Sequence, residues 1–194
     1  MSIQARRRRE RAEREKLIIT AARELAEAEG WEAVTTRRLA DRIEYSQPVL
    51  YSHFKGKDAI MTAVALEGFA ELVGELRAAR TGAPDAAGAL AGVAAAYGAF
   101  ADRHPALYDA MFRRDLDLAF AAEDSPAALK AGFEELAEAV RPHAGGDDLG
   151  LLTETFWAAL HGLVTLERGG RLPREARERR LALLLGRFVR DGAG

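Results

Sequence analysis

Apolar residues recur every three or four positions through most of the chain, which is the period of helices that bury one face. Gly30 ends the first such stretch, and residues 81–84 break the pattern most clearly because they include a glycine and a proline. No stretch forms a convincing strand. The pattern therefore predicts an all-α fold of about nine helices. The long ones are expected over residues 10–29, 57–80, 85–103, 105–121, 126–141, 147–168 and 174–190.

Two short helices are predicted between the first two long ones. They cover residues 36–43 and 47–53, and residues 44–46 connect them. Thr35 and Ser46 are the residue types that cap helix N-termini, at the positions where caps are needed. Two short helices joined in this way have the geometry of a helix-turn-helix, whose second helix lies in the major groove of DNA. The pattern thus predicts a DNA-binding head.

A set of residues in this region carries a family resemblance: Gly30-Trp31-Glu32-Ala33, Thr35, Arg37, Leu39-Ala40, Ser46, Leu50-Tyr51, His53-Phe54 and Lys57. Together they resemble the DNA-binding domain of the TetR family of bacterial regulators. The resemblance implies a homodimer with a four-helix bundle made from the last two helices of each subunit. It also implies an effector pocket in the C-terminal domain. One departure is Glu44, since the family usually has Gly in this turn, and a non-Gly residue at positive φ costs roughly 1 kcal/mol.

The second short helix and its flanks supply the predicted DNA contacts. By position and by resemblance, the residues expected to read or abut bases are Gln47, Tyr51, His53 and Tyr45. The residues expected to hold phosphates are Thr35, Arg37, Ser52 and Lys57, and Ser46 and Pro48 complete the predicted site.

The charge distribution agrees with a head that meets a polyanion. Residues 1–60 carry 13 Lys or Arg and 10 Asp or Glu, whereas the remainder of the chain is net acidic. Arg6 to Arg9 form a run of like charges that predicts a flexible basic arm over residues 1–9. The arm is either a solvated tail or a segment that reaches phosphates or a minor groove.

The chain after the head is predicted to hold the regulatory part. The expected division is a helix-turn-helix domain over residues 10–56, a linking helix over 57–80, and a ligand-binding and dimerisation domain over 85–194. Trp157, His161 and Gly162 form a Trp-x-x-x-His-Gly pattern that resembles a subgroup of TetR-family regulatory domains. The alternative is that Trp157 and His161 are ordinary core residues.

Aromatic and soft side chains recur on the later helices, and a pocket of aromatic walls with few polar groups is the usual form of a small-molecule site. The predicted ligand-binding residues are Tyr97, Phe100, His104, Tyr108, Met111, Phe112, Phe133, Trp157 and His161. Such a lining favours a largely apolar ligand. Most of these residues must be plain core, since each helix needs a buried face.

The predicted dimer interface uses the last two helices. Its residues are Gly162, Leu163, Leu166, Leu181, Leu184, Leu185 and Phe188. The alternative is that the apolar stripe of the last helix completes the core of its own subunit.

Several functional classes lack the residues that they need. The chain has no Cys, and its four His stand at 53, 104, 143 and 161 without the spacing of metal ligands. No Ser-His-Asp order, phosphate loop or HExxH sequence is present. The uncharged run over 86–101 is shorter than the ~20 residues of a membrane span. We therefore expect no catalytic site, metal, cofactor or membrane partner, and a cytoplasmic location.

The leading hypothesis is a DNA-binding transcriptional repressor that a small molecule releases from a palindromic double-stranded operator. The alternatives are a DNA-binding regulator without an inducer, and an all-α metabolite-binding protein or enzyme. Salt-dependent binding to a palindrome separates the first two from the third. Loss of that binding when a metabolite is added separates the first from the second.

Overall fold

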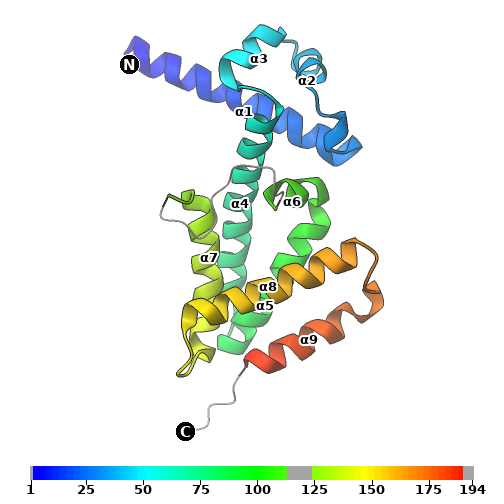
Figure 1. The fold of residues 1–194 in the computed structure, drawn as a ribbon. Helices are drawn as coiled ribbons and strands as arrows, with labels where there is room; N and C mark the ends of the chain where they lie inside the picture. The colour runs from blue at the N-terminus through cyan, green and yellow to red at the C-terminus, as the bar shows by residue number, and fades with distance from the viewer. Residues whose placement is uncertain (1, 113–123, 190–194) are drawn as a thin grey trace. The chain divides into compact units, whose positions relative to one another are not determined.

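The computed structural model describes residues 2–112 and 124–189. Every regular element in these ranges is helical, which confirms the predicted fold class (Figure 1). The α-helices are α1 (Ile3–Glu29), α2 (Thr36–Arg42), α3 (Gln47–His53), α4 (Lys57–Thr81), α5 (Ala86–Arg103), α6 (Pro105–Met111), α7 (Ala127–Val140), α8 (Leu149–Arg168) and α9 (Arg177–Phe188). Short 3-10 turns, η1 (Trp31–Ala33), η2 (Arg141–His143) and η3 (Arg174–Ala176), precede α2, follow α7 and precede α9.

The helical period located most helices to within a few residues. The prediction over residues 47–53 matches α3 at both ends, and that over 57–80 matches α4 to one residue. The last helix begins three residues later than predicted, because η3 occupies its expected first turn. The second half of the helix predicted over 105–121 lies outside the described residues.

A flexible basic arm is predicted over residues 1–9, but residues 3–9 are the start of α1. Ser2 caps this helix, since its Oγ accepts a hydrogen bond from the Ala5 N–H at 3.2 Å. Arg6 pairs with Glu10 four residues later, with Nε and Oε1 3.0 Å apart. Arginine is also a good helix former. Cap, ion pair and propensity together offset the repulsion among the four arginines.

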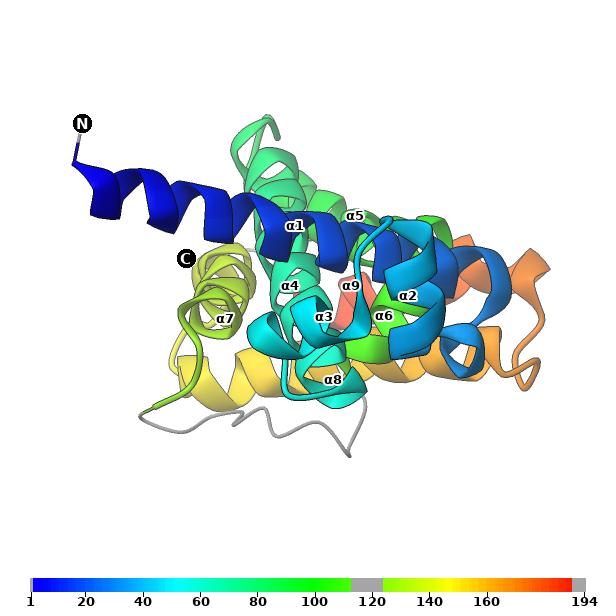
Figure 2. The same cartoon turned by 90° about the horizontal axis from the view of Figure 1, so that it is seen from above.

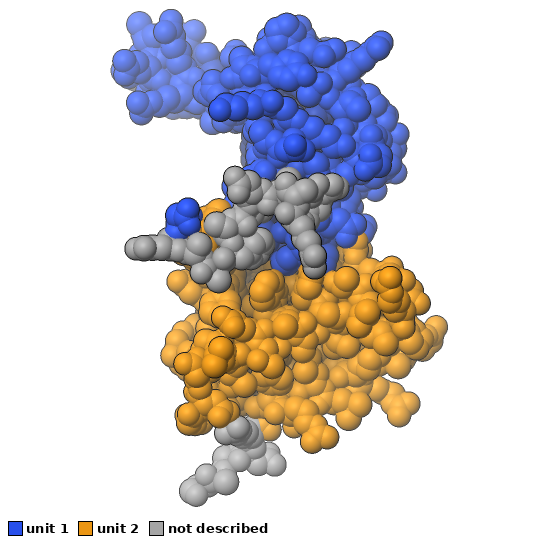
Figure 3. All heavy atoms as spheres, in the orientation of Figure 1, with its two compact units in different colours: residues 1–69, 104–124 blue, residues 70–103, 125–194 orange. Residues whose placement is uncertain are grey.

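The chain forms two compact units (Figure 3). Unit 1 comprises residues 1–69 and 104–124, and unit 2 comprises residues 70–103 and 125–194. The boundary falls inside α4, so this single helix contributes to both units. A second boundary lies between α5 and α6, which places α6 in the same unit as the helix-turn-helix.

Unit 1 has a core made by α1, α2, α3 and the first part of α4. Ile18, Leu39, Leu50 and Val64, one from each of these helices, are each at most 1% exposed. The helix α6 is held against α1 by polar contacts. The two Glu27 carboxylate oxygens accept the Ala106 and Leu107 backbone N–H groups, each at 3.0 Å, which satisfies two amides at the α6 N-terminus.

Two further contacts fix α6 in unit 1. The Trp31 indole Nε1–H donates to the Ala106 carbonyl oxygen at 2.7 Å. Gly68 of α4 lies so close to α6 that a Cβ there would stand 2.7 Å from Leu107 Cδ1 and 2.8 Å from Met111 Sδ. Because real Cβ atoms do not approach other atoms so closely, a larger residue at this position would force Leu107 or Met111 to shift.

Unit 2 is organised around α8. Phe156 on α8 and Phe100 on α5 are fully buried, and Phe188 of α9 packs against Phe156 with ring centroids 5.0 Å apart. Buried Glu167 accepts hydrogen bonds from Arg177 and Arg180, which ties α8 to α9. By length and composition, α8 is the one helix in the described part of the chain that could cross a membrane. A single helix of this kind is weak evidence for a membrane span, and buried Glu167 near its end pairs with Arg177 and Arg180.

Candidate functional site

The turn between α2 and α3 fixes how the second helix is presented. After α2 the Tyr45 N–H donates to the Ala40 carbonyl oxygen at 3.0 Å, and Glu44 between them has φ 58°. This is a Schellman-type helix end, in which the C′ residue is left-handed and is usually Gly. Glu44 therefore holds the positive φ that the family resemblance anticipated for this position.

The helix α3 presents one polar face to solvent. Leu50 is buried and anchors the helix, while Gln47, Pro48 and Ser52 are exposed. Tyr51, one helical turn after Gln47, is 53% exposed, and its hydroxyl lies 3.4 Å from Thr36 Oγ1. Gln47 and Tyr51 thus share the outward face of α3, as predicted for side chains that read bases.

His53 does not share that face, so the prediction that it points outward is wrong. Its side chain is 5% exposed, and Nδ1 lies 3.3 Å from Glu15 Oε1 on α1. The reason is helical spacing, since His53 follows the buried Leu50 by three residues and lies on the same side of α3. The period of the short helix already contained this signal.

The predicted phosphate-binding residues differ in their surroundings. Arg37 is exposed, whereas the Thr35 side chain caps α2 by accepting the Arg38 N–H at 3.2 Å. The Lys57 ammonium donates to the Trp31 carbonyl oxygen at 2.5 Å, which uses one of its three hydrogens. The Ser52 hydroxyl donates to the Val49 carbonyl oxygen at 2.6 Å.

The remaining predicted DNA-contact residues flank the start of α3. Ser46 is the exposed N-cap residue of α3, and Tyr45 in the turn is half-buried. Arg38 and Arg42 of α2 are also exposed but are paired, to Glu29 and Glu24 respectively, with 2.8 Å between the nearest charged atoms. The hydrogen bond from Arg38 holds the pKa of the Glu29 carboxyl below its usual value. Neither of these two glutamates pairs with Arg37, which is exposed on the same helix.

In unit 2 the structure brings three of the predicted ligand-binding residues together. Tyr97 is 1% exposed, and its hydroxyl accepts a hydrogen bond from Trp157 Nε1–H at 3.1 Å. The same hydroxyl lies 3.4 Å from His161 Nδ1, and Thr165 Oγ1 lies 3.4 Å from His161 Nε2. Burial lowers the pKa of His161. The result is a half-buried polar cluster, Tyr97, Trp157, His161 and Thr165, with a neutral imidazole at neutral pH.

The other predicted ligand-binding residues are elsewhere. In unit 2, Phe100 is fully buried and Phe133 is 36% exposed. His104, Tyr108, Met111 and Phe112 all belong to unit 1. There His104 Nδ1 lies 3.4 Å from Arg23, and the Tyr108 and Phe112 ring centroids are 4.7 Å apart. The nine residues therefore form two sets, one in each unit.

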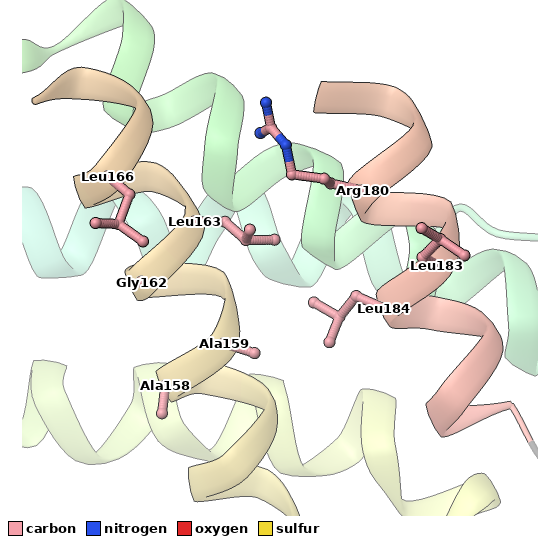
Figure 4. A pocket seen from close by; sticks show the side chains of 8 residues that line it. All are labelled: Ala158, Ala159, Gly162, Leu163, Leu166, Arg180, Leu183 and Leu184. Atoms are coloured by element: carbon pink, nitrogen blue, oxygen red, sulfur yellow. The ribbon is translucent and has the colours of Figure 1, made fainter. Parts of the chain in front are cut away.

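An apolar groove lies between α8 and α9 (Figure 4). Its lining includes four predicted interface residues, Gly162, Leu163, Leu166 and Leu184. Ala158, Ala159, Arg180 and Leu183 complete the lining. Leu183, which the predicted stripe omitted, is 68% exposed. It was missed because it falls beside the stripe of Leu181, Leu184, Leu185 and Phe188, and no residue of α9 is buried.

Sequence reasoning also missed the contacts of Glu27 and Trp31 with α6. These residues are 79 and 75 positions from Ala106, and the helical period carries no information about such distant partners. Within the described ranges, no group of three or more His, Asp and Glu side chains is placed to hold a metal ion.

Two family matches together cover most of the chain. Residues 18–64 match the family described as bacterial regulatory proteins, tetR family, and residues 90–188 match the tetracyclin repressor-like, C-terminal domain. The first match contains α2 and α3, and the second contains α8 and α9.

Curated relatives and solved structures agree with these matches. The HTH-type transcriptional regulator Rv0681 of Mycobacterium tuberculosis is 30% identical over 158 residues, which are 79% of this chain and 69% of that protein. The tetracycline repressor protein class C of Escherichia coli is 50% identical over 48 residues, 25% of this chain and 22% of the repressor.

Two solved structures share the fold. A protein from Rhodococcus sp. RHA1 has a TM-score of 0.74 and 23% identity, with 90% of this chain and 92% of that chain covered. The TetR family transcriptional regulator PfmR from Thermus thermophilus has a TM-score of 0.63 and 22% identity, with 92% and 98% covered. On the family matches and the Rv0681 relationship, the chain belongs to the TetR family and is a DNA-binding transcriptional regulator.

Proposed function

We propose that this regulator is a homodimeric repressor whose two α3 helices read the half-sites of a palindromic operator, and that a small, largely apolar effector releases it. The observation that carries the proposal is the polar outward face of α3, with Gln47 and Tyr51 one turn apart and exposed. A repressor acts on the chromosome, so the proposal includes a cytoplasmic location.

The side chains of the head divide into two roles. Gln47 carries an amide that can bond an adenine through two hydrogen bonds, and Tyr51 and the half-buried Tyr45 lie where they can abut bases. Exposed Arg37, together with Lys57, supplies positive charge for phosphates. Thr35, Ser46, Pro48 and Ser52 shape and flank this surface. His53 positions α3 through Glu15 rather than reading a base.

Dimerisation through the α8–α9 groove is supported by its exposed leucines. Leu183 is 68% exposed and Leu166 is 39% exposed, and both line a groove that is otherwise apolar apart from Arg180. Burying such a surface against a second copy gains roughly 25 cal/mol per Å². A palindromic operator needs two heads, so a two-fold dimer is the expected assembly.

The effector site that we propose centres on the cluster of Tyr97, Trp157 and His161 in unit 2. It combines aromatic surface with two or three convergent polar groups, which is the usual composition of a small-molecule site. Trp157 and His161 are half-buried, so both retain surface for a ligand. The Trp-x-x-x-His-Gly pattern supports the assignment to the corresponding subgroup.

The test begins by selecting genomic fragments that bind the protein and deriving an operator from them. Gln47→Ala should cost roughly 1–3 kcal/mol on the operator and relax preference at one base step in each half-site. Thr20→Ala is the control, because Thr20 is exposed on α1 and belongs to none of the predicted DNA contacts. Equal effects of the two substitutions on operator and scrambled duplex would refute the assignment of α3 as the reading helix.

The effector part is tested separately. Apolar compounds are screened for those that raise the melting temperature and also release operator DNA. Tyr97→Phe and Trp157→Phe should weaken the affinity of such a compound, since each removes one member of the hydrogen-bonded pair. A releasing compound whose affinity is unchanged by both substitutions does not bind at this cluster.

A further inference from the structure

The N-terminal half of α1 carries more positive charge than any other part of the head. Residues 3–16 contain seven Lys or Arg and three Asp or Glu. Because this stretch is helical from Ile3 onwards, its arginines have fixed directions rather than those of a loose tail. The family matches begin only at residue 18, so they assign no role to this stretch.

Two contacts hold this half of α1 beside the C-terminal turn of α3. Arg11 donates from its guanidinium to the Ser52 carbonyl oxygen at 3.3 Å, and Glu15 accepts the contact from His53 at the same distance. Beyond Arg11 the helix continues to Ile3, which at 1.5 Å per residue is about 12 Å. Figures 1 and 2 show this segment of α1 running on past α3.

The arginines divide between two faces of α1. Successive residues on a helix are ~100° apart, so Arg7, Arg8, Arg11 and Arg14 all lie within ~60° of the line through buried Ile18 and Ala22. That line is the side of α1 from which Arg11 and Glu15 contact α3. Arg6 and Arg9 lie on the opposite side, where Arg6 pairs with Glu10.

We propose that the first four turns of α1 are a second DNA contact, which binds backbone phosphates next to the groove occupied by α3. This inference rests on the proposed DNA-reading role of α3. Exposed Arg7, Arg8 and Arg14 are its phosphate-binding side chains, and the Arg11–Ser52 contact fixes their position relative to α3. A duplex carries one negative charge per about 1.7 Å of axis, so a strip of this length spans several phosphates.

The contact contributes affinity without sequence preference. Arginines that meet phosphates release counterions, so each such contact steepens the dependence of log K on log salt by about 0.9. With this slope, a tenfold decrease in salt concentration strengthens binding by roughly a factor of ten for each contact. Base preference stays with Gln47 and Tyr51.

The test compares two double variants of the full-length protein that lose the same charge. Arg7→Ala with Arg8→Ala removes two positive charges from the side of α1 that contacts α3. Arg6→Ala with Arg9→Ala removes two positive charges from the opposite side. Binding to a long mixed-sequence duplex and to the selected operator is measured across about 50 to 200 mM salt. Circular dichroism checks that α1 stays helical in both variants, as alanine should ensure.

The first pair should lose about two units of salt slope for each chain bound, on both duplexes. The second pair should keep the slope of the unaltered protein. Equal losses in the two variants would overturn the inference, because net charge alone would then account for them, and so would unchanged binding in both. If the unaltered protein binds neither duplex, the proposed function itself fails, which is a separate outcome.

Discussion

Replacing Glu44 by glycine is expected to stabilise the protein. Glu44 is the one non-glycine residue with positive φ in the described part of the chain, at 58°. It is exposed and stands at the C′ position of α2, where the Tyr45 N–H to Ala40 carbonyl bond closes the helix end. Its Cβ therefore strains a backbone conformation that a glycine adopts without a clash.

The magnitude follows from two opposing terms. A left-handed conformation costs a residue with Cβ roughly 1–2 kcal/mol. Glycine gives back roughly 0.5–1 kcal/mol because the unfolded chain gains conformational freedom. The net expected gain for Glu44→Gly is about 0.5–1 kcal/mol, and in a chain of this size 1 kcal/mol corresponds to about 2–4 °C in Tm.

The assay is urea and thermal unfolding of Glu44→Gly beside Glu44→Ala at the same protein concentration. The alanine variant removes the carboxylate but keeps the Cβ, so it should show no comparable gain. Both variants lose one negative charge near the proposed DNA surface, so they should change DNA affinity alike. If alanine stabilises as much as glycine, charge rather than backbone strain is the cause, and a glycine variant without any gain refutes the strain altogether.

Three further outcomes are expected. In urea unfolding, Gly68→Ala should destabilise the protein by roughly 1–3 kcal/mol, because its Cβ would meet Leu107. Gly74→Ala in the same helix is the control: a Cβ there has nothing within 4 Å, so the change should be neutral or stabilising by up to about 1 kcal/mol. Burial raises the pKa of Glu135, but hydrogen bonds from Arg77 and Arg80 outweigh it and leave the pKa below its usual value. Ionised Glu135 therefore makes its full contribution to stability at any pH above its unfolded pKa. Glu135→Gln should lower the free energy of unfolding by about 1–2 kcal/mol near pH 7, and this difference from the unaltered protein should vanish as pH falls through the folded pKa. The double variant Leu183→Glu with Leu166→Glu should be monomeric by light scattering. Its helix content should be unchanged, since both side chains are exposed in the single chain. Dimers that persist would exclude the groove as the interface.

The choice of Leu183 and Leu166 for that test comes from the structure rather than from the sequence. The apolar stripe of the last helix suggested Leu184 and Phe188, but Phe188 packs on buried Phe156. A charge at Phe188 would therefore disturb the core of a single chain as well as any interface. One periodic stripe cannot separate residues that pack within the chain from those left for a partner.

Helical periodicity predicted the bounds of helices and the faces that their residues share, but not the contacts between residues far apart in the chain. It located α3 at both ends and placed Gln47 and Tyr51 outward, because spacing within one short helix fixes which residues share a face. It also contained the inward direction of His53, which follows buried Leu50 by three residues. Ser2 and Glu10, which stabilise Arg6–Arg9 as helix, are also local, but the like charges of this run favour a flexible arm and so hid their effect. The contacts of Glu27 and Trp31 with Ala106, 79 and 75 positions away, leave no trace in the period.

The assignment of α6 to the DNA-binding unit limits how an effector can act on the head. Residues 85–194 suggested one regulatory domain, yet α6 lies in unit 1, where Glu27 caps its N-terminus and Trp31 bonds its first turn. The Trp31 carbonyl oxygen also accepts a hydrogen bond from the Lys57 ammonium at the start of α4, so one residue of η1 bonds both α6 and α4. The chain passes from unit 1 into unit 2 within α4 and returns to unit 1 immediately before α6. An effector bound in unit 2 can change DNA affinity only if it binds one arrangement of the head better than another. We propose that α4 and α6, which stand at these crossings, carry that preference to α1 and α3. Glu27→Ala should therefore lower the ratio of DNA affinities measured without and with a releasing compound, while leaving the compound's own affinity for unit 2 unchanged. A ratio that stays the same would mean that the α6 contacts only stabilise unit 1.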